Sequence, residues 1–232
     1  MAQGITNLVH LFIAPSRLFA RLKNQPSWVM SFAALAVVGM TLDWFSFEVA
    51  LQASLSQLPQ RATPEMIQDA VTYLEGRRFI NVAFSPIKVG IAIAVFSYVL
   101  YLVCSVSRPV SLPGRKHFLS VVVWSSWILM IEKAVALVVR SAIGPVNSNI
   151  GLAFSQPLGL GIINVSSSDP GLLYALNAVN VFSVWYLFLV SAGISILCGF
   201  GRLKSILVVA SVWLTGVVVS AGLMRFALEG VH

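Results

Sequence analysis

Apolar residues gather into five long runs separated by shorter polar stretches. A helix that crosses the hydrocarbon core of a bilayer, about 30 Å thick, needs roughly 20 mostly apolar residues. Five runs reach this length, at residues 28–50, 86–106, 119–140, 174–198 and 205–226. None contains a proline beyond its first position, so we expect five simple helices. The pattern predicts an all-α, polytopic membrane protein built as a bundle of five transmembrane helices.

Two shorter segments have the pattern of an amphipathic helix. The first lies in a cytoplasmic N-terminal segment, residues 1–27, which precedes the five-span transmembrane domain at residues 28–232. In "PSRLFARL", which begins at residue 15, three apolar residues share one face and Arg17 and Arg21 lie on another. We favour a position on the cytoplasmic leaflet over packing beneath the bundle. The second segment, residues 63–78, has Thr63 as its expected N-cap. Its place, at the interface or in solvent, stays open.

Composition supports the membrane assignment. The chain is 58% hydrophobic and 10% charged, whereas soluble domains are about one quarter charged. Its net charge of +7 does not indicate nucleic-acid binding, because the charges lie in short loops between apolar runs and form no continuous basic face. The first residues do not read as a cleavable secretory signal, because a short amphipathic stretch precedes the first long run.

The distribution of loop charges predicts an orientation. Basic residues flank one end of the runs, and residues 144–171 contain none. The positive-inside rule then places the N-terminus in the cytoplasm and the C-terminus outside, in the inner membrane of a bacterial-type cell. We expect the basic residues to contact anionic lipid or a protein partner; they are Arg17, Arg21, Lys23, Arg108, Arg115, Lys116, Arg202 and Lys204.

Three charged residues fall inside apolar runs at similar depth, somewhat past the midplane: Asp43, Glu132 and Lys133. Adjacent helical residues point about 100° apart, so Glu132 and Lys133 face different neighbours. An unpaired charge at this depth costs a few kcal/mol or more, and we therefore predict that Lys133 pairs with Asp43. A proton or ion relay, a substrate site and a packing pair all remain open, and packing is favoured. Four further charges lie nearer the outer boundary: Glu48, Lys88, Arg140 and Arg225.

Small residues at helical spacing predict close helix contact, inside the bundle in preference to a dimer face. They are Gly90 and Ala94 in the second run, and Ser191, Ser195 and Gly199 in the fourth. Trp124 and Trp127 are expected to anchor or pack, while Asn177 and Asn180 are expected to form interhelical hydrogen bonds, with a cavity lining as the alternative.

Motifs for chemistry are missing from the sequence. Cys104 and Cys198 lack CxxC spacing, which argues against a disulfide, a zinc site or a redox pair. His10, His117 and His232 are scattered among loops and ends, so we expect no metal site. No serine, cysteine or histidine combination suggests a nucleophile with its base. We therefore expect no cofactor and no catalytic residue, with an intramembrane enzyme as a minor alternative.

Three junctions carry a resemblance to a known family. They are "APSRLFARLKNQPSW" before the first run, "PGRKHFLS" before the third, and "LNAVNVFSVWYLFLVSAGISILCGFGRLKSILVVASVWL", where Phe182 and Trp185 open the helix, Gly193 lies within it and Arg202 to Ser205 form a basic turn. Together these resemble the bacterial branch of the YIP-domain (Ypt/Rab-interacting protein) membrane proteins. The resemblance covers nearly the whole chain and implies five helices without an agreed enzymatic activity. The family's Asp-Leu-Tyr-Gly-Pro-like element is not evident, so a GTPase-related role is not implied.

Taken together, these patterns predict a non-catalytic membrane scaffold or accessory subunit that binds other membrane proteins, lipid, or both. The rival prediction is a small transporter or channel component in which Asp43, Glu132 and Lys133 line a hydrated path. Self-association stays open, and the partner, lipid or substrate is not specified by the sequence.

Overall fold

The computed structural model describes residues 2–56, 63–107, 109–143, 158–160 and 169–229, and within them the chain forms nine α-helices and no β-strand. Five candidate membrane spans are long and apolar enough to cross a bilayer, as predicted. They are Val29–Glu48, Ile67–Val106, Arg115–Ala142, Val181–Cys198 and Arg202–Phe226. Helices of this length and composition indicate an integral membrane protein.

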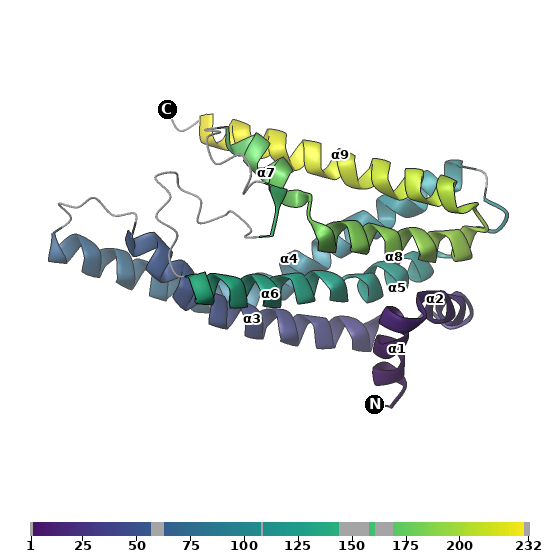
Figure 1. The fold of residues 1–232 in the computed structure, drawn as a ribbon, viewed down its shortest axis with the longest axis horizontal. Coiled ribbons are helices and arrows are strands. Elements are labelled where there is room, and N and C mark those ends of the chain that lie inside the picture. The colour runs from purple at the N-terminus through teal and green to yellow at the C-terminus, as the bar shows by residue number, and fades with distance from the viewer. Residues whose placement is uncertain (1, 57–62, 108, 144–157, 161–168, 230–232) are drawn as a thin grey trace.

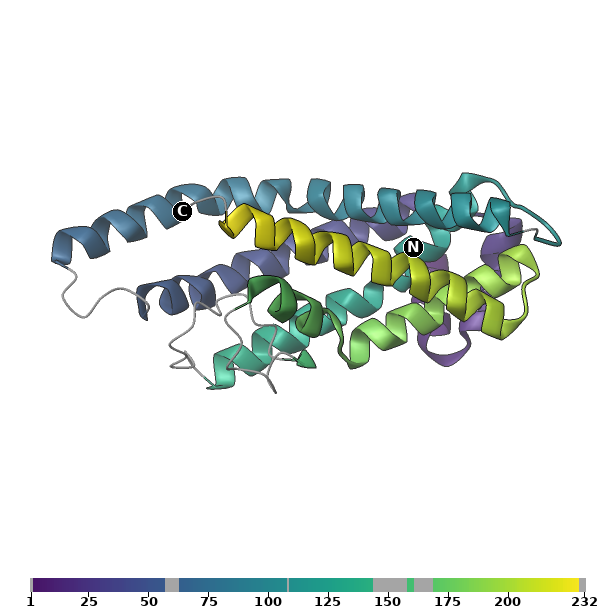
Figure 2. The same ribbon diagram turned by 90° about the horizontal axis from the view of Figure 1, so that it is seen from above.

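The long helices run side by side along the length of the molecule (Figures 1 and 2). They are α3 (Val29–Ser56), α4 (Pro64–Val106), α5 (Arg115–Ser125), α6 (Trp127–Ile143), α8 (Val181–Cys198) and α9 (Arg202–Glu229). About half of the α5–α6 span and of α8 is buried, against 17–22% for the spans of α3, α4 and α9. The bundle therefore has α5, α6 and α8 at its centre, while α3, α4 and α9 direct most of their apolar side chains outward.

In the centre, α5 and α8 approach each other closely. A Cβ added to Gly193 of α8 would overlap Cγ1 of Val121 on α5. Both helices belong to one buried apolar cluster that includes Phe118, Ile128 and Leu189. Gly193 thus lets two backbones approach closely, as small residues do in membrane bundles.

The two N-terminal helices lie at one end of the bundle. Figure 1 shows α2 (Pro15–Asn24) nearly end-on, so it crosses the long helices instead of following them, and α1 (Ala2–Ile13) leads into it. Leu18, Phe19 and Leu22 of α2 are fully buried and α2 packs against α8. This apolar face therefore packs into the protein core, the alternative to the favoured position on the leaflet. The location of the segment at the cytoplasmic leaflet stays a prediction.

The second span is much longer than predicted. α4 has 43 residues and is therefore about 64 Å long, twice the hydrocarbon thickness. It begins at Pro64, directly after the predicted cap Thr63, and continues through Pro86 to the opposite end. Residues 63–78 are thus part of the same helix as the second run, and the expectation of spans without interior proline fails here.

The third and fourth runs are interrupted, which corrects the expectation of simple helices. Ser126 separates α5 from α6 as a single turn residue, and its hydroxyl donates to Val122 O at 2.8 Å. In the fourth run, α7 (Pro170–Ala178) stops and Val179 and Asn180 adopt extended backbone before α8 begins. α7 packs against α9, so only α8 continues through the centre of the bundle.

We predict that Gly193→Ala destabilises the protein by about 1–3 kcal/mol, the usual cost of overpacking a filled core. The matched control is Gly216→Ala, since an added Cβ there has no neighbour within 4 Å and alanine favours the helix. Unfolding free energies in mixed detergent–SDS micelles provide the measurement. Equal stability of the two variants would contradict the close packing of Gly193 on Val121, and Val121→Ala should partly rescue Gly193→Ala.

Candidate functional site

A cluster of polar side chains crosses the bundle where the sequence placed its intramembrane charges. Lys133 Nζ on α6 lies 2.5 Å from Asp43 Oδ1 on α3, so the pairing predicted from side-chain direction is present. The hydroxyl of Ser85 on α4 donates to the other oxygen of the same carboxylate, Asp43 Oδ2. The pair and its hydroxyl donor therefore join three helices.

Glu132, the neighbour of Lys133, faces a different part of the bundle from Lys133. Its Oε1 accepts a hydrogen bond of 2.8 Å from Nδ2 of Asn180, the residue that precedes α8. The other end of the same amide, Oδ1, accepts from Ser183 N, and Ser183 Oγ accepts from Asn180 N, which completes a capping box. One amide thus caps the buried start of α8 and satisfies the carboxylate of α6. We call Asp43, Ser85, Glu132, Lys133 and Asn180 the polar cluster.

The charged residues of the cluster lie within candidate membrane spans, in the half of the bundle away from Arg115. Glu132 follows Arg115 by 17 residues and precedes Arg140 by 8, which corresponds to about 26 Å and about 12 Å along the helix. The break between α7 and α8 occurs at the same level, since Asn180 contacts Glu132 there. An interrupted helix inside the membrane is tolerated where protein groups satisfy the freed backbone, and the capping box does this.

The two halves of the polar cluster differ in burial. Glu132 is 8% exposed and Asn180 is also 8% exposed, deep between α6 and α8. The side chains of Lys133 and Asp43 are 31% and 27% exposed, so this pair reaches the surface between α3 and α6. Chemically, the cluster can hold opposite charges in an apolar layer, fix the register of four helices and exchange protons through carboxylate, ammonium and hydroxyl groups.

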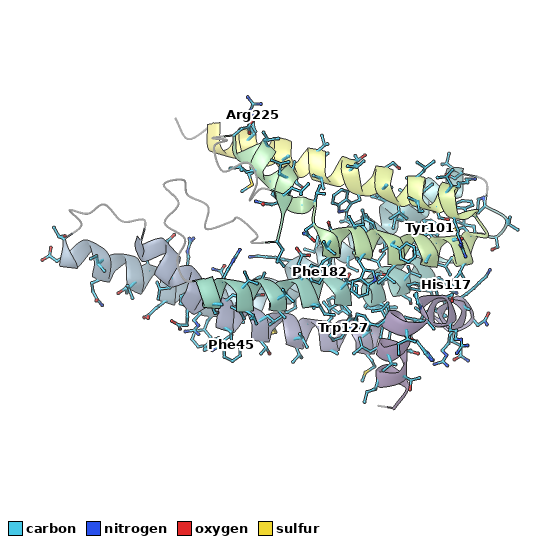
Figure 3. The ribbon with its side chains drawn as sticks, viewed as in Figure 1. Phe45, Tyr101, His117, Trp127, Phe182 and Arg225 are labelled. Atoms are coloured by element: carbon cyan, nitrogen blue, oxygen red, sulfur yellow. The ribbon has the colours of Figure 1, made fainter. Side chains whose placement is uncertain are left out.

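Charges predicted near the outer boundary form a second group. Glu48 accepts from Arg78 Nη1 at 2.9 Å, and the Arg78 guanidinium lies 3.8 Å from the centre of the Trp44 ring. Sequence reading missed the role of Arg78, although aromatic residues in the facing helix signal a cation–π partner. Arg225 Nη1 lies 3.8 Å from Oδ2 of Asp169, the N-cap of α7, near the end of α9 and away from His117 and Tyr101 (Figure 3).

The remaining two outer charges differ in exposure. Lys88 is exposed on α4, and Arg140 is partly buried on α6. Both are long side chains that can extend toward the interface.

The predicted basic contact residues gather at the other end of the bundle, which we call the basic end. Two of them cap helices. Lys23 Nζ donates to Ile196 O near the end of α8 at 3.0 Å, and Lys204 Nζ donates to Ser107 O after α4 at 2.6 Å. Arg115 lies over the rings of Tyr98 and Tyr101. Arg17, Lys116 and Arg202 are exposed, Arg21 bonds Asn7, and Arg108 lies outside the described residues.

The small residues predicted to allow close helix contact have mixed outcomes. Gly199 is the C-cap of α8 with φ +68°, a conformation that favours glycine. Gly90 meets Phe32, because a Cβ added there would lie 3.1 Å from Phe32 Cζ. Ala94 is exposed, Ser191 is buried within α8, and Ser195 Oγ donates to Phe200 O at 2.7 Å. Close α3–α4 contact at Gly90 fits the packing prediction, whereas the main packing glycine of α8 is Gly193.

The tryptophans predicted to pack do so by joining two spans. Trp124 Nε1 donates to Ser27 O at 2.8 Å, and Trp127 Nε1 donates to Ser31 Oγ at 3.0 Å. Both bonds hold the centre of the α5–α6 span against the start of α3 and its preceding loop, so the rings act as packing groups with satisfied N–H donors.

Other predicted residues have mixed outcomes. Asn180 makes the interhelical bond expected of it, whereas Asn177 Oδ1 is buried without a hydrogen-bond partner among the described residues. Cys104 and Cys198, 94 positions apart, are buried free thiols in the same apolar cluster. Their spacing in the sequence gave no signal for this shared position. His10 and His117 lie in the described part of the chain, and His232 lies outside it.

No protein-family model, no curated protein and no solved structure matches the chain. The resemblance to YIP-domain proteins therefore stays a prediction from the sequence.

We predict that Lys133→Met lowers the unfolding free energy by about 1–3 kcal/mol, because Asp43 then keeps only its hydroxyl donor in an apolar layer. The control is Lys88→Met, which removes an exposed lysine that has no partner among the described residues. Exchanging both members, Asp43→Lys with Lys133→Asp, should recover part of the loss. A double exchange as damaging as either single change would contradict the pairing.

A second prediction concerns Asn180. Asn180→Asp keeps an acceptor for the cap but places a carboxylate against Glu132, so we expect a loss of about 1–2 kcal/mol. Adding Glu132→Gln supplies a donor again and should restore at least half of that loss in the same unfolding assay. Ser183→Ala serves as the control that weakens only the capping box. Independent, additive effects of Asn180→Asp and Glu132→Gln would contradict the contact.

Proposed function

We propose that the protein is a non-catalytic membrane scaffold or accessory subunit that holds another membrane protein. The observation that carries the proposal is the internal pairing of the polar cluster. Asp43 is satisfied by Lys133 and Ser85, and Glu132 is satisfied by Asn180. Charges paired in this way stabilise one arrangement of α3, α4, α6 and α8, which suits a rigid platform.

The length of α4 supports a partner-binding role. With twice the length of a simple span, its first part extends with α3 beyond the rest of the bundle (Figure 2). Tyr73 is 59% exposed and Phe79 is 72% exposed on this part. A helical extension with large exposed side chains offers a surface for a partner beside or outside the bilayer.

The location of basic residues supports the orientation and compartment that we propose. Arg115, Lys116, Arg202 and Lys204 all lie at the basic end, and Arg225 lies at the other. By the positive-inside rule, the basic end and the N-terminus face the cytoplasm of a bacterial-type cell and the C-terminus faces outward. The proposed membership of the YIP-domain family rests on the three sequence junctions and fits a role without catalysis.

A site-specific photo-crosslinker tests the scaffold function. We expect the crosslinker at Tyr73 to yield one discrete adduct in native membranes, with the same membrane protein co-purifying at a fixed ratio in mild detergent. The control position is Val218, 68% exposed on α9, which should react with lipid only. A chain that purifies alone and gives no adduct at Tyr73 would contradict a stable partner.

A second candidate, a small transporter or channel component, is favoured by the broken fourth run. In many carriers the substrate or ion site lies where a membrane helix is interrupted, and here the interruption meets Glu132. If this second function holds, the protein in proteoliposomes should carry a flux of ions or substrate across the membrane. The Glu132→Gln variant should lose this flux while it stays folded. The scaffold requires an adduct at Tyr73 that Glu132→Gln leaves unchanged.

A further inference from the structure

An open hollow lies at the basic end, where α1 and α2 meet. It has a volume of about 600 Å³ and is lined by Thr6 of α1, Arg21 and Asn24 of α2, and Gln25. These residues come from two helices that cross beside the end of α8, outside the polar cluster. The hollow is separate from the candidate site described above.

Arg21 is held in position within this hollow. Its Nη1 donates to Oδ1 of Asn7 on α1 at 2.9 Å, and Asn7 is only 3% exposed. A guanidinium has five N–H donors, and this bond uses one of them. A buried amide therefore orients the exposed arginine and leaves its other donors for a ligand, as in sites that recognise phosphate by a planar fork.

The other lining groups also favour an anion. The amides of Asn24 and Gln25 supply N–H donors, and the lining contains no carboxylate. The first acidic residue of the chain is Asp43, far along α3, whereas Arg17, Arg21 and Lys23 all lie on α2. Positive potential at the hollow is thus not cancelled by a local acidic group.

The surface beside the hollow is apolar, which distinguishes a lipid from a free anion. On α1, Ile5 is 67% exposed, Val9 is 47% exposed and Ile13 is 78% exposed. Thr6, which lines the hollow, follows Ile5 directly and belongs to the same helix. A molecule with a phosphate and acyl chains fits this combination, because its headgroup meets donors and its chains meet apolar side chains.

We propose that the α1–α2 hollow binds the phosphate headgroup of an anionic phospholipid, with Arg21 as its principal ligand and Asn7 as the residue that positions Arg21. The proposal goes beyond the partner-binding role and does not depend on it. Two nearby cations have other tasks, since Lys23 caps α8 and Lys204 bonds the end of α4. The proposed site therefore depends on the orientation of Arg21 and not on the total positive charge at the basic end.

Native mass spectrometry of the full chain tests the site, with the protein held in micelles that contain equal amounts of phosphatidylglycerol and phosphatidylcholine. We expect the wild-type chain to retain phosphatidylglycerol preferentially. Arg21→Gln should weaken that retention about tenfold, the order expected for one charge-assisted contact. Arg202→Gln is the matched control, because it removes an exposed charge from the same end outside the hollow. It should change retention by less than twofold.

Further variants distinguish specific binding of the lipid at Arg21 from unspecific attraction by positive charge. Arg21→Lys keeps the charge but loses the fork, so it should bind phosphatidylglycerol less well than the wild type and better than Arg21→Gln. Equal losses in Arg21→Gln and Arg202→Gln would overturn the proposal in favour of unspecific charge attraction. Equal retention of both lipids would also overturn it. Displacement of the lipid by millimolar inorganic phosphate would identify a free-anion site instead. Asn24→Leu changes the lining of the hollow without altering its charge. Unchanged retention of phosphatidylglycerol in both Asn24→Leu and Arg21→Gln would exclude the hollow as the binding site.

Discussion

The hydrocarbon core of a bilayer offers no hydrogen-bond partners, so polar groups placed there depend on the chain itself for their partners. This constraint is clearest in α8, which has 18 residues and is about 27 Å long, slightly less than the apolar layer. Asn180 caps its start. Near its end, the carbonyls of Ile196, Leu197 and Cys198 accept from Lys23 Nζ, Ser111 Oγ and Val110 N, respectively. A short central helix is thus completed at both ends by groups from other parts of the chain.

The same constraint links this helix to the charged residues. Asn180 serves two purposes with one side chain, because its oxygen caps α8 and its nitrogen donates to Glu132. Lys133 turns the other way and meets Asp43, which also accepts from Ser85. Two adjacent charges on α6 therefore connect four helices at one level, and each contact is oriented by the 100° step between neighbouring residues. The buried half and the partly exposed half of the polar cluster follow from this geometry.

The basic side chains at the basic end differ in their roles: some bind groups within the protein and others are exposed on its surface. Lys23 and Lys204 neutralise the carbonyl ends of α8 and α4, which favour positive charge through the helix dipole. Arg115 rests on two tyrosine rings, and Arg21 is oriented by Asn7. Residues of identical charge in the sequence therefore have different environments, and only some of them are available to lipid or to a partner. This division is why the lipid proposal concerns a single arginine.

Much of the architecture was predictable because it depends on local properties. Hydropathy and length determined the five membrane-crossing segments and the all-α class. The regular rise of the helix determined that Asp43 and Lys133 share a depth, and the angle between neighbours determined that Glu132 faces elsewhere. The charge distribution in the loops determined which ends of the helices are basic. Each of these inferences uses the local sequence of single helices or loops and requires no knowledge of how the helices pack.

The features that only the tertiary structure revealed depend on contacts between residues far apart in the sequence. The hydropathy pattern does not reveal the break at Val179 and Asn180, because the capping groups lie inside an apolar run. The spacing of Asn180 and Ser183 is nevertheless that of a capping box. The contact of Lys23 with Ile196 joins residues 173 positions apart. Ser85 and Asn180 became partners of charges only when α4 and α8 packed beside α3 and α6. Helical period and composition fix which side chains need a partner in an apolar layer, whereas the packing of the helices decides which partner each one meets.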